Sequence, residues 1–346
     1  MRVHAESSVG SREAPTSLLD LLEAHLGSSE CRSLLHGMPE SLARRALPDP
    51  ARDFLSRDGR QFRARLVRIA WELALSGRDD RPPLAPELPL LIELIHAGSL
   101  IVDDVQDDAR ERRGAPALHL TWGTPVAINT GNWLYFLPQL MLQQAGLAPT
   151  LELSLHRAIS RALVWCHQGQ GLDLQARSFE LERAQIGNVV SVISRLKTGT
   201  LMELAATVGA TAAGADEKQT AALVRFGNDL GVGLQMLNDL VGIRAASERR
   251  CEDLRSARAT WCWAWAAEQF VPPEYERLKA QAQEVAECGT DPRPLAKALA
   301  CVIEPGVRAS RIHLQGALQR LRAELGPSPG MTSLQAEVER LVESHV

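Results

Sequence analysis

Apolar residues recur at intervals of three and four along nearly the whole of this 346-residue chain. Leu66, Ile69, Ala70 and Leu73 illustrate the spacing. Because an α-helix returns to the same face about every 3.6 residues, the spacing predicts amphipathic helices. Alternating runs of Val, Ile, Thr and aromatic residues, which are typical of strands, are nearly absent, and good helix formers such as Leu, Ala, Arg and Glu dominate. The sequence therefore predicts an all-α fold.

Proline and glycine clusters divide this helical pattern into about a dozen predicted helices. The clearest loop covers residues 78–86, RDDRPPLAP, because a proline inside a helix removes a backbone hydrogen bond and clashes with the preceding turn. The chain has no internal repeat and no long linker. We therefore expect a single all-helical domain over residues 1–346, in which residues 1–15 form a flexible N-terminus.

The charge balance and the cysteine spacing exclude several classes of protein. Lys and Arg number 38 against 42 Asp and Glu, a net charge of −4, whereas nucleic-acid-binding proteins normally carry a basic surplus. No stretch approaches the ~18 consecutive apolar residues of a transmembrane helix. The chain has no C-x-x-C pair that would suggest a zinc site, and its cysteines are too scattered to suggest a disulfide framework. We expect a cytoplasmic protein without a transmembrane segment or a nucleic-acid partner, with reduced thiols at Cys31, Cys166, Cys251, Cys262, Cys288 and Cys301.

The most specific motif is aspartate-rich and ends a strongly apolar stretch, LIELIHAGSLIVDDVQDDARERRG, residues 91–114. Asp103, Asp104 and Asp107 form a D-D-x-x-D pattern. Since residues four apart share a helix face, the carboxylates of Asp103 and Asp107 would repel each other unless a cation lay between them. Mg²⁺ fits, because it prefers oxygen ligands and is often held by one or two carboxylates together with substrate phosphates. A solvated acidic turn is the alternative, but the apolar helix before the motif and the basic pair after it favour a cation site.

Polar side chains also interrupt apolar helices elsewhere in the chain. A lone lysine in such a helix is usually a surface residue whose apolar stem lies along the protein. Here, however, several polar groups occur along the chain on either side of the aspartate motif. They are Arg60 and Arg63, His96, Arg112 and Arg113, Gln170 and Asp173, Lys197 and Thr198, Gln235, Asn238 and Asp239, and Arg258.

In their order and spacing, these motifs resemble those of the trans-isoprenyl diphosphate synthases, or polyprenyl synthetases, from about residue 59 to residue 260. The resemblance implies an isoprenoid-synthase-type helical bundle in which two aspartate-rich helices face each other across a deep central cavity. It implies three Mg²⁺ ions that hold the diphosphate of an allylic substrate, and a homodimer. By this resemblance the metal ligands are Asp103, Asp107, Asp173, Asn238 and Asp239, and the catalytic residues are Asp103, Asp104, Asp107 and Lys197.

The resemblance also implies contacts to two diphosphates. Lys197 and Arg112 match the contacts to the allylic diphosphate, and Arg258 stands where a lysine is usual. Arg60 takes the lysine position of a Gly-Lys-x-x-Arg motif, which keeps the charge but replaces a point charge by a planar fork. The implied patch for isopentenyl diphosphate is Arg60, Arg63, His96 and Arg113, and the remaining substrate-binding residues are Arg112, Thr198, Gln235 and Arg258.

The second aspartate-rich motif departs from the family pattern. Where D-D-x-x-D is usual, this chain has Asn238, Asp239 and Gly242. An amide can still bind Mg²⁺, but fewer carboxylates bind it more weakly. The sequence is also similar to the opening of the Asn-Asp-x-x-(Ser/Thr/Gly)-x-x-x-Glu motif of class I terpene cyclases, although its closing position falls on Ala246 and Glu248 comes two residues later.

Product length is expected to depend on Gly98 and Ser99, which precede the first aspartate by five and four residues. In the family a bulky residue there stops elongation early, so small residues imply room for a product of about C20 or longer. Trp133, Tyr135 and Phe136 form either a floor for the cavity or ordinary core packing.

Three functional hypotheses follow from these motifs. The leading one is a Mg²⁺-dependent prenyltransferase that joins an allylic prenyl diphosphate to isopentenyl diphosphate. The alternative is a class I terpene cyclase, or a prenyltransferase with a non-diphosphate acceptor, on the same fold. The third is a non-catalytic partner subunit, which would not need to retain Asp103, Asp107, Asp173 and Lys197.

Overall fold

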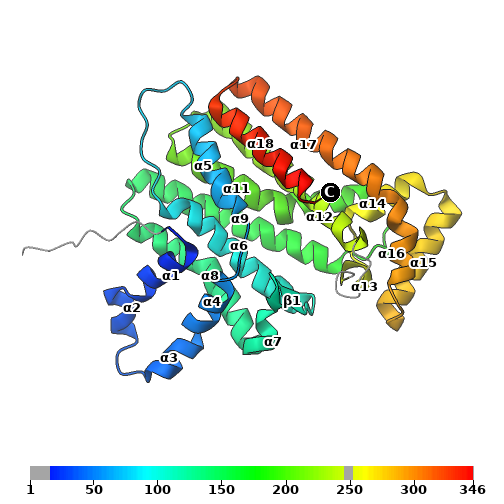
Figure 1. Ribbon diagram of the computed structural model, residues 1–346, viewed down its shortest axis with the longest axis horizontal. Helices are drawn as coiled ribbons and strands as arrows, with labels where there is room; N and C mark the ends of the chain where they lie inside the picture. Colours follow the sequence, from blue (N-terminus) through cyan, green and yellow to red (C-terminus); the bar gives the residue numbers. More distant parts are fainter. Residues whose placement is uncertain (1–15, 245–251, 346) are drawn as a thin grey trace, which may run out of the picture.

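The computed structural model describes residues 16–244 and 252–345 and is almost entirely helical over that part of the chain (Figure 1). Its only sheet within those residues is an antiparallel hairpin of β1 (Glu111–Arg112) and β2 (Ala115–Pro116). The all-α prediction is therefore confirmed. In chain order the helices are α1 (Leu18–Leu26), α2 (Ser29–Leu34), α3 (Glu40–Ala46), α4 (Pro48–Leu55), α5 (Phe62–Ala74), α6 (Glu87–Gln106), α7 (Leu118–Trp122), α8 (Thr124–Gln144), α9 (Pro149–Gln175), α10 (Ile186–Ser194), the π-helical turn η1 (Arg195–Gly199), α11 (Thr200–Ala212), α12 (Glu217–Arg244), α13 (Glu252–Arg255), α14 (Trp261–Gln269), α15 (Pro272–Cys288), α16 (Arg293–Leu299), the 3₁₀ turn η2 (Ala300–Val302), α17 (Ile303–Leu325) and α18 (Pro329–Glu343).

Helix boundaries follow the proline signals of the sequence. Pro149, Pro272 and Pro329 each stand at the first position of a helix, where the missing N–H would have no partner in any case. The proline-rich segment 78–86 is non-helical, as predicted, and connects α5 to α6. The helices are more numerous than the sequence predicted, because several are single short turns in connections.

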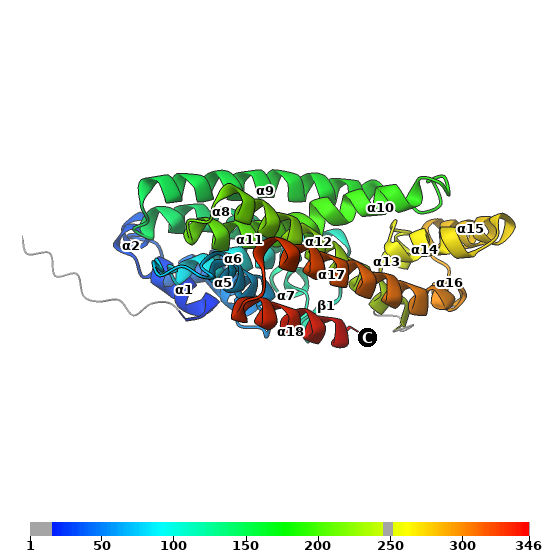
Figure 2. The same cartoon turned by 90° about the horizontal axis from the view of Figure 1, so that it is seen from above.

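The long helices pack side by side around α6, α11 and α12. α6 lies along α8, α11 packs against α5, α9 and α12, and α12 packs along α17. Figure 2 shows α9 along one edge of the bundle and α18 near the opposite edge. This arrangement brings the aspartate end of α6, the end of α9 and the second half of α12 toward one another, and these are the segments that carry the predicted site residues.

Gly98 has a packing role that the sequence did not suggest. A Cβ atom at this position would lie 2.7 Å from the carbonyl oxygen of Gly131 on α8, so glycine is what allows α6 and α8 to approach closely. Gly98 is buried at this helix–helix contact and does not line the site cavities described below. The expectation that Gly98 leaves room for product is therefore corrected to a role in helix packing.

Two apolar clusters fill the interior. The larger one joins α1, α4 to α9, α11, α12, α17 and α18, and the smaller one joins α10 and the second half of α12 to α13, α14, α15 and α16. α12 contributes Leu230 and Leu237 to the first cluster and Met236 and Leu240 to the second. One continuous helix thus contributes side chains to both cores. The single domain over residues 1–346 stays a prediction.

Several expectations concern the chain as a whole. The N-terminal segment 1–15 and Cys251 lie outside the described residues, as do Ala246 and Glu248. Over the part that the structure describes, no helix has the length and apolar character needed to cross a membrane. Five cysteines within the described residues form no disulfide: Cys31, Cys166, Cys262, Cys288 and Cys301.

Candidate active site

The aspartates at the end of α6 face two cationic side chains from other elements. Asp107 caps the helix, and its Oδ1 accepts a hydrogen bond from Nη2 of Arg258 at 2.7 Å. Lys197 Nζ lies 2.7 Å from Asp173 Oδ2, at the end of α9, and 3.9 Å from Asp103 Oδ2. The structure thus brings together Asp103, Asp107 and Asp173, which are 70 residues apart at most, around cations from η1 and the segment after α13.

Lys197 is positioned by an irregularity in its helix. Residues 195–199 form the π-helical turn η1, which inserts an extra residue between α10 and α11. Such turns occur often at functional sites, because they redirect a side chain without ending the helix. Gly169 of α9 lies directly against this turn, where a Cβ atom would come within 2.6 Å of the Lys197 backbone nitrogen. The close approach of α9 places Asp173 within reach of Lys197.

The electrostatics of the carboxylates favour an added cation. Burial raises the pKa of Asp103 to about 6, and the charges of Asp107 and Asp173 add to the rise while Lys197 opposes it. Burial by itself would lower the pKa of Lys197, but Asp173 and Asp103 raise it above its usual range. Lys197 is therefore firmly protonated, and the carboxylates around it still carry more negative charge than the neighbouring cations neutralise.

Asp104 has a different environment from its two neighbours in the motif. It is fully buried, and its Oδ1 accepts hydrogen bonds from Nε of Arg112, at 2.8 Å, and from Nη2 of the same side chain. Its Oδ2 is buried and has no hydrogen-bond partner among the described residues. Asp104 therefore anchors the hairpin that carries Arg112. Arg112 was expected to contact substrate, but in this structure its guanidinium is already paired.

Arg258 is also engaged by the protein. Only 4% of the residue is exposed, and its Nη1 donates to the carbonyl oxygen of Asp173 at 2.7 Å while Nη2 binds Asp107. It therefore holds the ends of α6 and α9 together, a role that the predicted substrate contact did not include.

The second aspartate-rich motif presents its amide, and not its carboxylate, to the cavity. Asp239 is 7% exposed, and its oxygens accept hydrogen bonds from Gln235 Nε2 at 2.7 Å and from the Trp261 backbone N–H at 2.8 Å. Burial, with the charge of Asp253, raises the pKa of Asp239 to about 8. Asn238 is exposed and lines both cavities described next. Asp239 was predicted as a metal ligand, but the structure commits it to a hydrogen-bond chain that continues from Gln235 to Thr198.

Two adjoining cavities contain most of the predicted site residues. The first, which we name the acidic cavity after Asp103, has a volume of about 200 Å³ and is also lined by Lys197 and Gln170. The second has a volume of about 700 Å³ and is basic. They share a boundary made of Arg63, His96, Leu100, Thr198 and Asn238.

The basic cavity contains all four residues of the predicted isopentenyl diphosphate patch: Arg60, Arg63, His96 and Arg113. Burial lowers the pKa of His96 well below its usual value, and the charges of Arg63 and Arg113 lower it further. The Nε of Arg63 is buried without a hydrogen-bond partner among the described residues. Cations packed this closely repel one another, so the cavity is suited to a multiply charged anion.

Of the three aromatic residues considered as a floor of the cavity, only Tyr135 lines it. Tyr135 lines the acidic cavity together with Ser99, and its ring packs edge-on against His167 with centroids 5.0 Å apart. Trp133 instead packs against His25, and Phe136 is 68% exposed. Helix geometry explains the difference, since consecutive residues of α8 point to different sides.

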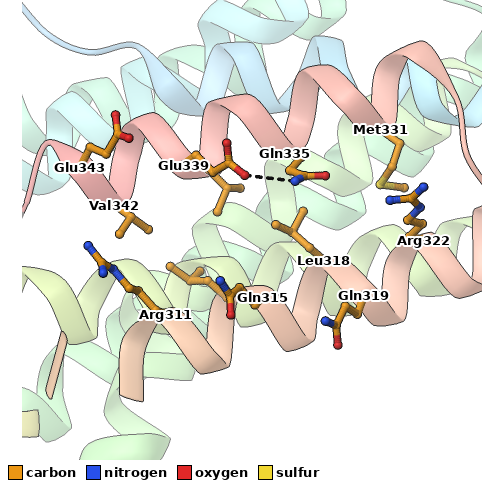
Figure 3. A pocket seen from close by; sticks show the side chains of 12 residues that line it. Arg311, Gln315, Leu318, Gln319, Arg322, Met331, Gln335, Glu339, Val342 and Glu343 are labelled. Carbon is orange, nitrogen blue, oxygen red and sulfur yellow. Dashed lines mark hydrogen bonds between the residues drawn. The ribbon is translucent and has the colours of Figure 1, made fainter. Parts of the chain in front are cut away.

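A further hollow lies between α17 and α18 and has a volume of about 570 Å³ (Figure 3). Its walls carry both arginine and glutamate side chains, such as Arg311, Arg322 and Glu343, and Gln335 donates a hydrogen bond to Glu339 across one turn of α18. None of the predicted site residues lines this hollow. It is therefore separate from the candidate active site.

The structure adds residues that were not predicted. Gln106 lines the acidic cavity and accepts a hydrogen bond from Gln170 at 2.7 Å. Asp253 of α13 interacts electrostatically with Asp173, Lys197 and Asp107, and its pKa is raised to about 6 by desolvation and by Asp173. A signal for Asp253 was present, since it stands five residues before Arg258 in EDLRSAR, but a single acid in a polar stretch is not distinctive.

Comparison with known proteins assigns the chain to a family. The family model described as polyprenyl synthetase matches residues 44–298. Geranylgeranyl pyrophosphate synthase of Eremothecium gossypii is 29% identical over 199 residues, which are 57% of this chain and 60% of the relative. Geranylgeranyl diphosphate synthase of Sulfolobus acidocaldarius is 30% identical over 191 residues, 54% of this chain and 55% of the relative. The aligned part thus spans less than two thirds of either relative.

A solved structure extends the similarity of fold to nearly the whole chain. Geranylgeranyl pyrophosphate synthase from Corynebacterium glutamicum, complexed with isoprenyl diphosphate and magnesium, superposes with a TM-score of 0.76 at 21% identity. The superposition covers 94% of this chain and 97% of that one. Taken with the family match over residues 44–298, this chain belongs to the polyprenyl synthetase family.

Proposed function

We propose that the protein is a Mg²⁺-dependent prenyltransferase that condenses an allylic prenyl diphosphate with isopentenyl diphosphate, giving a longer trans-prenyl diphosphate of about C20 or more. The observation that carries the proposal is that the cavity containing Asp103 and Lys197 adjoins a basic cavity beside α6. A terpene cyclase acts on a single diphosphate and needs only the first of them. The names of the Eremothecium and Sulfolobus relatives support a geranylgeranyl-length product.

The oxygen-bearing side chains in and beside the acidic cavity suit Mg²⁺ chemically. The described residues include no ready-made cluster of three or more His, Cys, Asp or Glu side chains that could hold a metal ion. Mg²⁺ does not require one, because one or two carboxylates with substrate phosphates and water commonly complete its coordination. Asp103 and Asp107 would hold it, with Asp173 and Asn238 as further oxygen donors, and three ions are expected from the family resemblance. When bound, Mg²⁺ would neutralise charge on the departing diphosphate.

The chain's own residues provide the rest of the chemistry. As the allylic C–O bond breaks, its electron pair leaves with the diphosphate, whose oxygens the ammonium group of Lys197 stabilises. The double bond of isopentenyl diphosphate then supplies the electron pair of the new C–C bond, and a proton is lost to the released diphosphate. Leu100, Leu163 and Leu201 line the acidic cavity and keep water from the carbocation.

A product assay tests the proposal. The protein is incubated with Mg²⁺ and dimethylallyl, geranyl, farnesyl or geranylgeranyl diphosphate, each with and without labelled isopentenyl diphosphate. We expect longer labelled diphosphates, formed only when isopentenyl diphosphate is present. Hydrocarbons or alcohols formed without it would instead identify a cyclase. No product in any tube, with activity restored by a co-purified protein, would identify a partner subunit.

We also propose that the protein is a homodimer that associates through α8 and α9. These neighbouring helices expose large apolar side chains, with Phe136 68%, Val164 62% and Trp165 47% exposed. Such a group of exposed apolar residues is typical of an interface.

The free thiols of the described cysteines support the predicted cytoplasmic location.

A further inference from the structure

Two residues that follow α18 form part of the wall of the basic cavity. Ser344 and His345 line it together with Arg60, although they are more than 280 positions apart in sequence. Nη1 of Arg60 donates a hydrogen bond to Ser344 Oγ at 2.9 Å and lies 3.4 Å from His345 Nε2. Neither Ser344 nor His345 belongs to a motif that the sequence singled out.

The acceptors at these two residues are oriented by their own hydrogen bonds. His345 Nδ1 lies 2.6 Å from the carbonyl oxygen of Leu341, which can only accept, so Nδ1 carries the proton and Nε2 presents its lone pair to Arg60. The hydroxyl of Ser344 donates to the same carbonyl at 2.8 Å and keeps its lone pairs for Arg60. Arg244 of α12 fixes the His345 backbone by donating to its carbonyl oxygen at 3.1 Å. Burial, with the charge of Arg60, lowers the pKa of His345, which keeps the ring neutral.

These contacts are not needed to dock α18 on the bundle. The helix already buries Leu334, Val338 and Leu341 in the larger core. It is also tied to α5 by the ion pair between Arg65 Nε and Glu337 Oε1, at 2.6 Å. The hydrogen bonds of Ser344 and His345 therefore act on Arg60 more than on the helix.

We propose that Ser344 and His345 are positioning residues that hold one nitrogen of the Arg60 guanidinium, so that its other N–H groups bind the diphosphate of isopentenyl diphosphate. The inference rests on the proposed function. A guanidinium is rigid and planar and carries five donors, so one nitrogen can be held by the protein while the others bind phosphate oxygens. An ammonium group has a single nitrogen and only three donors, so it offers fewer donors to the phosphate once one of them is held by the protein. The arginine at position 60 and the acceptors at positions 344 and 345 thus belong together.

Steady-state kinetics test the inference, with the Michaelis constants for isopentenyl diphosphate and for the allylic substrate measured separately. For Ser344→Ala and His345→Ala we expect the first constant to rise about 3–10-fold and the second to stay unchanged. His345→Gln should recover most of the loss, because its amide oxygen can accept from Arg60. Glu343→Ala is the matched control, since Glu343 is exposed on the adjacent position and faces the separate hollow between α17 and α18.

A double-mutant cycle shows whether the effect passes through Arg60. In an Arg60→Ala background, His345→Ala should add nothing; an additive loss would overturn the inference. Equal rises in both Michaelis constants, or no rise in either, would also overturn it. Thermal unfolding of each variant identifies one that fails to fold; if His345→Ala does, Ser344→Ala provides the test. Wild-type protein without any product dependent on isopentenyl diphosphate would refute the proposed function instead, so the two failures are distinguishable.

Discussion

Three aspartates of one motif have three different environments, and the difference lies in what each oxygen contacts. Asp103 faces the acidic cavity beside Lys197, Asp107 binds Arg258, and Asp104 is buried against Arg112. The D-D-x-x-D motif therefore contains two carboxylates proposed to hold a metal, Asp103 and Asp107, and a third, Asp104, that holds the β1–β2 hairpin in place. We expect substitutions within the motif to separate loss of activity from loss of stability.

Replacing Asp103 by Asn should abolish activity and yet stabilise the protein. The native pKa of Asp103, about 6, lies above its ordinary value of 3.8, so the folded state favours the protonated form. This contribution to stability is present below pH 3.8 and is lost as the pH rises through 6, so at pH 7 the ionised group destabilises the fold. We expect Asp103→Asn to raise the free energy of unfolding at pH 7 by roughly 1–2 kcal/mol in the absence of metal. Urea unfolding at pH 4 and pH 7 measures it; a gain at pH 4 equal to that at pH 7 would contradict the explanation.

Tyr135 should limit the length of the product. Its ring packs against His167 and lines the acidic cavity, which Ser99 also lines. Tyr135→Ala removes the ring, and we expect the main product to lengthen by at least one isoprene unit. Tyr135→Phe keeps the ring and should keep the wild-type length. Chromatography of the dephosphorylated products distinguishes the two, and an unchanged length in Tyr135→Ala would show that another residue forms the floor.

At the scale of helices, adjacent positions on α6 have separate roles. Gly98 lies against the backbone of α8, whereas Ser99 lines the cavity. Substitutions at these two positions therefore separate effects on helix packing from effects on product length. Gly98→Ala should lower the free energy of unfolding by roughly 1–3 kcal/mol, because α6 and α8 must separate to admit the methyl group. Ser99→Phe should shorten the product while changing stability much less. Thermal unfolding together with product analysis checks both, and a shorter product from Gly98→Ala with unchanged stability would restore the original expectation.

The elements show which parts of the site the sequence could predict. Local signals were sufficient for Asp103, Asp107 and Lys197, because helical spacing and motif resemblance placed them in one site. The same signals could not predict the pairing of Asp104 with Arg112, which depends on the turn of the β1–β2 hairpin. Nor could they predict that the Asp239 carboxylate already accepts hydrogen bonds within the protein, since one donor is the backbone N–H of Trp261, which tertiary packing brings close.

Irregular structure was the other source of error. The π-helical turn η1 has no distinctive sequence, because RLKTG reads as ordinary helix. The start of the last helix has a misleading local signal. Thr332 with Gln335 fits the spacing of a capping box, yet the N-cap of α18 is Ser328, four residues before Thr332, and its hydroxyl accepts from the Met331 backbone N–H. Pro329 at the first helical position was the better guide.

At the scale of the whole molecule, the exposed apolar residues of α8 and α9 predict association. Phe136→Asp combined with Val164→Asp should convert a dimer to a monomer, because removing unpaired charges from water at the centre of an apolar interface costs more free energy than the contact returns. Light scattering coupled to size-exclusion chromatography measures the mass. Ile312→Asp on α17 is the matched control, since Ile312 is 70% exposed on another face and should leave the mass unchanged. A wild-type protein that is monomeric at micromolar concentration would contradict the proposed interface.

The position of Lys197 between Asp103 and Asp173 gives the unliganded enzyme an internal counter-ion. Together with Arg258 it balances much of the charge of the aspartates before any ligand arrives. The negative charge that remains still favours a divalent ion, but such an ion would compete with Lys197 and Arg258 for the aspartate oxygens. In the proposed function, a diphosphate that pairs with Lys197 would leave Asp103 and Asp173 able to hold Mg²⁺. The counter-ion would then couple the binding of the metal to the binding of the substrate.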